Sequence, residues 1–353
     1  MFALVVGCDA DGRNRYFRTG KLLLRTPTRP DVYKIPRTPV SHTVKLPLAS
    51  YVQLVLNLAA THMTARPQTI QIFLPQGVPH GIRIAELTTR IVQVIEVPRK
   101  LLKDFIAMPE CQRVDGAVYL LYGEDDTGRS KVYIGQTGTL ATRLDTHHKE
   151  KEFWEKALVI VSKTGNLTPT HTLYLESLCI QGAQKAKRYL TENGNRGSKP
   201  HTPAPLQADC DEIFDTARTL LATLGYAVFD PVLPTEVAES ETIYFCTRER
   251  AKAEGTYTSE GFVVRKGSTT VAEVAPAFAR HNYHRLYASL IEQGVLMRQD
   301  GLLVFTEDHL FKSPSAASAV VRAQAGAPKY WKTADGRTLE EVEQAKISEL
   351  PRS

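Results

Sequence analysis

Two stretches, GAVYLLYG at residues 116–123 and SKVYIGQT at residues 130–137, decide the fold expected for this chain. Both are rich in β-branched and aromatic residues, which strands favour, and the intervening EDDTGR has turn chemistry. Together they predict an antiparallel hairpin. Downstream, residues 139–154 predict a helix, 156–164 a third strand and 170–190 an amphipathic helix. We therefore expect an α/β (α+β) fold class, with a small antiparallel sheet flanked by helices at residues 113–197.

Other segments divide the rest of the chain. Its 353 residues exceed one ordinary compact domain. Pro- and Gly-rich composition marks the boundaries, because these residues interrupt regular structure. We expect a small β-rich lead-in element at 67–112, a Pro-rich linker with a helix at 198–240, a separate α+β C-terminal domain at 241–339, and a tail at 340–353.

Residues 1–66 differ in composition from the remainder. They contain ten Lys or Arg, three Asp and no Glu, so they carry the whole positive excess of the chain, whose net charge is +6. We expect this segment to be disordered or an over-extended N-terminus, with Met63 as the true start. An organellar transit peptide is the alternative, since such leaders are Arg-rich and poor in acidic residues.

Charge and cysteine usage narrow the class of protein. After residue 66, basic and acidic residues nearly balance, so any phosphate binding there must come from local clusters. The five cysteines lie far apart and form no CxxC pair, which disfavours a zinc ribbon and suits reduced thiols in a cytoplasm. No apolar run reaches the length of a membrane span. We expect a cytoplasmic protein without a membrane partner.

Polar residues follow the two expected strands in a characteristic order. Tyr133 lies fourteen residues after Tyr119 and begins the tripeptide YIG. The complete set is Tyr119 in AVY, Tyr133 and Gly135 in YIG, Arg143, His147, Glu176 in LYLES, and Asn193 in YLTENGN. Over residues 113–197 this pattern resembles the GIY-YIG nuclease family. Ala117 and Val118 replace the Gly and Ile of the family name, at positions that pack a strand.

The flanks resemble a bacterial subgroup of that family. IQIFLPQGVPHGIRIAELTTRIVQ at 70–93 is similar to the segment that precedes the nuclease domain there. GFVVRKGS, LIEQGVL, FTEDHLFKSPSAASAVV and YWK, within 261–332, are similar to a bacterial domain of uncharacterised function that follows it. The resemblance implies a metal-dependent endonuclease that hydrolyses phosphodiester bonds in DNA, with Mg²⁺ (or Mn²⁺) as cofactor.

The residue types suit that chemistry. A single carboxylate, Glu176, can hold Mg²⁺ and leave its other positions to water and phosphate. Arg143 offers a planar fork for two phosphate oxygens and shares one helix face with His147, four residues later. Tyr119, Tyr133 and His147 are rival acceptors for the proton of the attacking water, and the sequence does not choose among them.

Two further residues of the pattern have alternative roles. We expect Gly135 to allow close backbone approach. Asn193 is expected to pin a loop or to contact phosphate, the alternative being a helix C-cap. In the C-terminal domain, Arg265 and Lys266 are candidates for gripping DNA.

Two other functions stay open. The chain could be a catalytically inactive DNA-binding or assembly protein on the same scaffold. Alternatively, it could be a nuclease that acts on RNA or on branched or damaged nucleic acid. Cleavage of a plasmid in Mg²⁺ and in EDTA distinguishes the inactive protein from a DNA endonuclease. A panel of substrates distinguishes the nuclease that acts on RNA or on branched or damaged nucleic acid.

Overall fold

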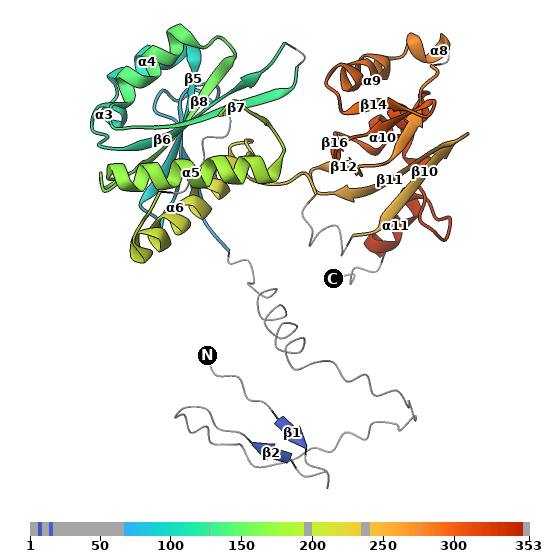
Figure 1. The fold of residues 1–353 in the computed structure, drawn as a ribbon, viewed down its shortest axis with the longest axis horizontal. Helices are drawn as coiled ribbons and strands as arrows, with labels where there is room; N and C mark the ends of the chain where they lie inside the picture. The colour runs from blue at the N-terminus through green and yellow to red at the C-terminus, as the bar shows by residue number, and fades with distance from the viewer. Residues whose placement is uncertain are drawn as a thin grey trace. The chain divides into compact units, whose positions relative to one another are not determined.

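The structure is a computed structural model that describes residues 6–8, 14–16, 67–126, 128–193, 200–233, 241–274 and 276–348 (Figure 1). It divides into two units, Met1–Arg66 and Pro67–Ser353. In the first unit, β1 (Val6–Cys8) pairs antiparallel with β2 (Asn14–Tyr16), a pair that the sequence did not predict. The expectation that residues 1–66 are disordered or over-extended otherwise concerns residues outside those described.

A seven-stranded sheet organises the second unit up to residue 193. Its strand order is β3 (Ile70–Phe73), β4 (Arg83–Leu87), β5 (Val92–Pro98), β8 (Trp154–Ser162), β6 (Ala117–Glu124), β7 (Ser130–Thr137) and β9 (Leu190–Thr191). Every pairing is antiparallel except the one between β7 and β9. The segment 67–112, expected as a lead-in element, thus supplies three strands of the same sheet.

Helices cover both faces of this sheet (Figure 1). On one face, α5 (Pro169–Ala186) and α6 (Ala204–Thr223) lie side by side over alternate strand residues such as Val118, Leu120 and Ile134. The intervening strand residues point to the other face, where they pack against α2 (Leu102–Ala107), α3 (Pro109–Gln112) and α4 (Leu140–Glu150) after the 3-10 turn η1 (Arg99–Leu101). The period of two along each strand therefore builds two separate cores.

Two expectations for this region need correction. The helix expected at 139–154 ends at Glu150, and Trp154 begins β8 with its side chain buried. The helix expected within the linker, α6, is part of the core, because Cys210, Ala217 and Leu220 are fully buried against the sheet and α5. Local sequence patterns did not show these long-range contacts.

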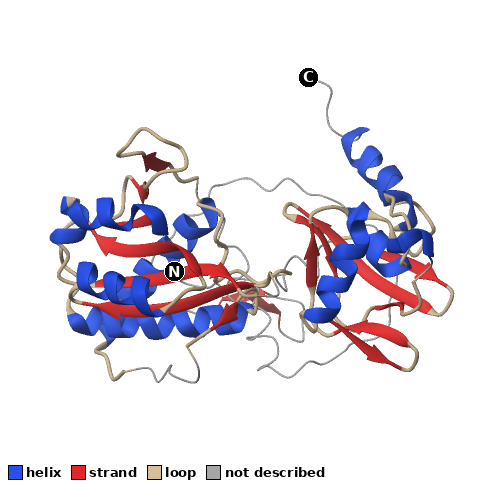
Figure 2. Ribbon diagram, turned by 90° about the horizontal axis from the view of Figure 1, so that it is seen from above, coloured by secondary structure: helices blue, strands red, loops and turns tan. Residues whose placement is uncertain are grey.

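The C-terminal residues form two further sheets with their own core (Figure 2). One has the order β10 (Ile243–Arg248), β11 (Ala251–Thr258), β12 (Gly261–Val264), β16 (His309–Phe311); the other has β13 (Thr269–Val271), β15 (Leu302–Phe305), β14 (Leu296–Gln299). The helices are α8 (Pro276–Ala279), α9 (Asn282–Glu292), α10 (Pro314–Arg322), η2 (Pro328–Tyr330) and α11 (Leu339–Ser348). Much of the expected tail is thus the helix α11.

The buried side chains of Phe262, Phe305 and Trp331 centre this second core. The expected α+β class with a separate C-terminal α+β domain is confirmed. Among the described residues, no helix has both the length and the apolar character that a membrane span requires.

Candidate functional site

The site is built on the hairpin of β6 and β7. Its register places Tyr119 directly opposite Gly135. The side chain of Tyr119 is fully buried on the face covered by α4. A Cβ added at position 135 would lie 2.4 Å from the Tyr119 hydroxyl, so the glycine provides room for the phenol ring. The expected close approach at Gly135 is therefore made by a tyrosine side chain.

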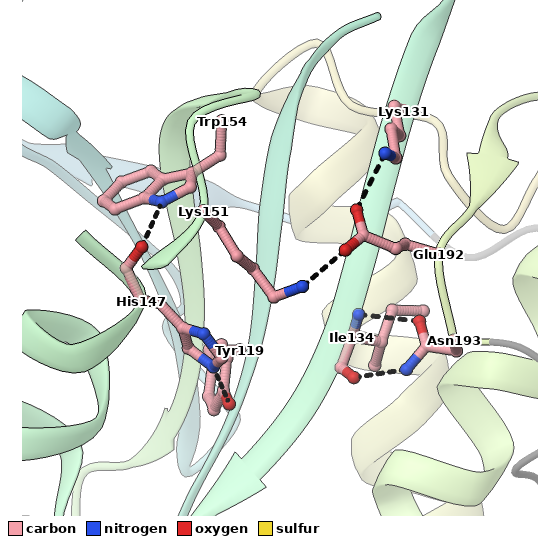
Figure 3. A network of polar contacts seen from close by, with 8 residues as sticks. All are labelled: Tyr119, Lys131, Ile134, His147, Lys151, Trp154, Glu192 and Asn193. Carbon is pink, nitrogen blue, oxygen red and sulfur yellow. Dashed lines mark hydrogen bonds and ion pairs between the residues drawn. The ribbon is translucent and has the colours of Figure 1, made fainter. Parts of the chain in front are cut away.

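Helix α4 brings two polar side chains to that phenol. Nε of Arg143 donates a hydrogen bond to the hydroxyl oxygen of Tyr119 at 3.0 Å. Nε2 of His147 lies 2.9 Å from the same oxygen, in the contact drawn in Figure 3. The spacing of four residues puts Arg143 and His147 on one helix face, as the sequence predicted. The three residues form one hydrogen-bonded cluster.

Protonation states in this cluster follow from burial and charge. Burial raises the pKa of Tyr119 to about 12, against the opposing hydrogen bond from Arg143. Burial, together with the charges of Arg143 and Lys151, lowers the pKa of His147 to about 4. At neutral pH the phenol is protonated and the imidazole is neutral. Nε2 of His147 and the Tyr119 hydroxyl share a hydrogen bond whose direction depends on the imidazole tautomer, and among the described residues Nδ1 of His147 is buried without a hydrogen-bond partner.

Tyr133 is the accessible phenol of the cluster. Its ring centroid lies 6.4 Å from that of Tyr119 and 5.2 Å from that of His147. Tyr133 is half-buried, whereas Tyr119 is 0% and His147 2% exposed. Nζ of Lys151 lies 4.4 Å from the Tyr133 ring centroid, in a cation–π contact. Of the three rival proton acceptors, only Tyr133 presents its side chain to solvent.

Glu176 approaches from the opposite face of the sheet, on α5. Its half-buried carboxylate accepts a hydrogen bond from the backbone N–H of Gln136, near the end of β7. Burial raises the pKa of this carboxyl, and the Gln136 hydrogen bond and the charge of Arg143 oppose that shift. The charge of Arg143, on α4, thus acts on the carboxyl of Glu176, on α5.

The residues present fit a metal held by one protein carboxylate. No group of three or more His, Cys, Asp or Glu capable of binding a metal occurs in the described part of the chain. Mg²⁺ is commonly held by one or two carboxylates, with water and substrate phosphate as its other ligands. The half-buried Glu176, fixed by Gln136, has the donor chemistry for this mode of binding.

Asn193, the last residue of the set predicted from the sequence, is hydrogen-bonded to β7 (Figure 3). Its Oδ1 accepts from the backbone N of Ile134 at 2.9 Å, and its Nδ2 donates to the backbone O of Ile134 at 2.5 Å. Both polar ends of the amide are thus used by one backbone residue. Of the roles expected for Asn193, the geometry matches that of a residue that holds a loop against the sheet.

Three charged residues beside the cluster were missed by the sequence reasoning. Glu192 forms ion pairs with Lys131, at 2.9 Å, and with Lys151, and Figure 3 shows the carboxylate between the two ammonium groups. Lys151 in turn contacts the Tyr133 ring. Glu192 follows the short strand β9, and 41 positions separate it from Lys151, so no local spacing signalled the network.

Comparison with known proteins finds a match for the C-terminal region alone. Residues 244–343 match the model of a family described as Domain of unknown function (DUF4357). This match fits the uncharacterised C-terminal domain that the sequence suggested. No curated protein and no solved structure matches the chain.

Proposed function

We propose that the chain is a metal-dependent endonuclease of the GIY-YIG type, which hydrolyses phosphodiester bonds in DNA. One observation carries the proposal: Arg143 donates to the buried Tyr119 hydroxyl, which also lies within hydrogen-bond distance of His147. A guanidinium fixed in this way can contact phosphate, and the carboxylate of Glu176, whose pKa the charge of Arg143 lowers, can hold a metal. The set of residues that resembles the family supports the same function.

Arg143 would stabilise the charge that develops on the phosphate. Its Nε donates to the Tyr119 hydroxyl, which fixes the plane of the guanidinium, and its Nη groups would contact substrate oxygens. The hydrogen bond to Tyr119 also raises the pKa of Arg143, so the cation persists throughout the working pH range. A fixed donor loses little free energy to reorganisation during the reaction.

Tyr133, in its phenolate form, would accept the proton of the attacking water and become the neutral phenol. This phenol is the accessible one of the three, and Nζ of Lys151 lies over its ring. Tyr119 and His147 are buried, so we assign them to positioning Arg143 and the face of Tyr133. Tyr133 thus has the catalytic role, and Tyr119 and His147 have positioning roles.

Glu176 would hold Mg²⁺ or Mn²⁺. When bound there, the metal supplies charge neutralisation at the phosphate and a lower pKa for bound water. Within the chain, the backbone N–H of Gln136 orients the carboxylate, and burial limits competition from solvent.

The test is cleavage of supercoiled plasmid in Mg²⁺ and in EDTA. Wild type, Glu176→Ala and a matched control, Glu150→Ala, are compared. Glu150 is an exposed carboxylate at the end of α4 that no ion pair engages among the described residues. We expect metal-dependent nicking by wild type and Glu150→Ala, and none by Glu176→Ala. An inactive wild type that still binds DNA would favour the scaffold-only alternative, and activity confined to RNA or branched DNA would favour the other.

A further inference from the structure

The C-terminal domain contains a groove that the proposed catalytic site does not use. Its volume is about 610 Å³. One wall is the outer face of the β10–β11 hairpin, with Phe245, Thr247 and Lys252. The other wall is the segment 266–269, which leads into β13. The groove lies wholly within the region that matches the family of unknown function.

Three unpaired cations line this groove. Arg250, Lys252 and Lys266 are exposed, and none of them forms an ion pair with another residue in the described ranges. By contrast, the neighbouring Arg248 pairs with Glu249 at 3.2 Å. Glu254 is the only acidic residue in the lining. The groove therefore has a net positive charge and suits a polyanion.

An aromatic ring lies among these charges. Phe245 is 37% exposed, although the residues beside it in β10, Tyr244 and Cys246, are buried. The strand register places Glu254 opposite Phe245 on one side, and an isolated bridge places Lys332 opposite it on the other. A large apolar side chain on this polar face is not needed for the core. It offers a flat surface to a ligand.

Hydrogen bonds hold the two walls together. Oγ of Ser268 accepts from the backbone N of Glu254 at 3.0 Å, and Oγ1 of Thr269 accepts from the backbone N of Lys252 at 2.8 Å. Within the second wall, Gly267 has φ +85°, and a Cβ added there would meet nothing within 4 Å. The groove is thus preformed, and its turn leaves space for close approach by a ligand.

We propose that this groove binds a single-stranded segment of nucleic acid, with its cations on the phosphates and Phe245 stacked on a base. Stacking requires an unpaired base, which a regular duplex does not offer to a side chain on its surface. An acidic peptide would satisfy the cations but would not need the exposed aromatic ring. The inference rests on the proposed function, since it names the form of substrate that the nuclease would hold.

The test is fluorescence anisotropy with the full chain and a labelled oligothymidylate of about 16 nucleotides, in EDTA so that no metal-dependent cleavage occurs. We expect Phe245→Ala to weaken binding roughly tenfold. Lys252→Ala/Lys266→Ala should weaken it and reduce the slope of log K against log salt by about 1.4, for two phosphate contacts to a single strand. An oligouridylate tests whether RNA binds as well as DNA.

Matched controls lie elsewhere in the same domain. Tyr257→Ala removes another aromatic ring, 38% exposed, and Arg280→Ala/Arg298→Ala removes two exposed cations outside the groove. Both should bind like wild type. Equal losses in controls and groove variants would overturn the proposal, as would no loss in the groove variants. Tighter binding of a duplex or of polyglutamate, with the same dependence on Phe245, would also overturn it.

Cleavage measured separately distinguishes this inference from the proposed function. Glu176→Ala should stop cleavage and leave the oligonucleotide affinity unchanged, because Glu176 lies outside the groove. If plasmid cleavage fails in wild type while the groove variants still lose affinity, the nucleic-acid groove stands and the nuclease does not. If wild type cleaves plasmid and the groove variants bind the oligonucleotide normally, the nuclease proposal stands and the groove proposal fails.

Discussion

Tyr119 and Gly135 face each other across the β6–β7 hairpin so closely that a Cβ at position 135 would lie 2.4 Å from the Tyr119 hydroxyl. The next nearest atom, Cζ of the same ring, would lie at 2.6 Å. The ring is fully buried and its oxygen lies within hydrogen-bond distance of Arg143 and His147. The ring therefore cannot move aside without breaking these contacts. The glycine therefore determines where Arg143 is held.

Gly135→Ala should displace Tyr119 and reduce cleavage at least tenfold. Overpacking a filled core of this kind destabilises a protein by about 1–3 kcal/mol. Thermal unfolding and plasmid nicking measure the two effects. Gly138→Ala is the control, because a Cβ there meets only the backbone O of Asp115, at an ordinary 3.5 Å. Equal behaviour of the two variants would show that the phenol does not depend on the glycine.

Glu176→Gln should abolish metal-dependent cleavage while leaving the fold intact. Burial raises the pKa of this carboxyl, which means that the charged form is disfavoured in the folded state. Removing the charge should leave the free energy of unfolding within about 0.5 kcal/mol of wild type, or slightly higher. Urea denaturation at neutral pH measures this. A large loss of stability would assign Glu176 to the fold instead of to the site.

Much of the region at 113–197 was predictable from sequence because it depends on local pattern. Three features follow from periods of two or 3.6 residues: the strands of the hairpin, the spacing of Arg143 and His147 on one helix face, and the apolar stripe that Glu176 borders. In the structure Tyr119, Arg143 and His147 form one hydrogen-bonded cluster. Asn193 is not a helix C-cap, because both ends of its amide are hydrogen-bonded to the backbone of Ile134. The sequence did not reveal this contact.

Long-range pairing accounts for the features that were missed. Nothing near residues 70–98 indicates that β5 pairs with β8, which places the expected lead-in within the seven-stranded sheet. Likewise, Glu192 meets Lys131 and Lys151 only because β9 returns alongside β7. The groove beside Phe245 depends on a cross-strand arrangement of exposed residues, and exposure cannot be deduced from an alternating pattern alone.

Glu192→Gln should tighten DNA binding. The substitution removes the negative charge that pairs with Lys131 and Lys151 and leaves both cations available to phosphate. The dissociation constant in EDTA should fall, and the slope of log K against log salt for a duplex should steepen by about 0.9 for each new phosphate contact. Glu155→Gln, an exposed carboxylate on β8, is the control. Weaker binding by Glu192→Gln would indicate that the carboxylate itself orients Lys151.

The neutral, buried His147 predicts that stability depends on pH. Its pKa is lowered to about 4 in the folded chain, chiefly by burial and then by Arg143, against an ordinary value near 6.5. Between these values the unfolded chain binds the extra proton, so the free energy of unfolding rises with pH. The contribution is complete above about pH 6.5 and is lost as the pH falls towards 4.

Urea denaturation across this range should show His147 contributing up to about 3 kcal/mol. His147→Gln keeps an amide near Tyr119 but does not titrate, so its stability should vary less with pH than that of wild type. Burial also lowers the pKa of His309 to about 4, so His309→Gln is measured in parallel and should remove a separate part of the same dependence. If wild type and His147→Gln give parallel curves between about pH 4 and pH 6.5, the imidazole is not held neutral beside Tyr119.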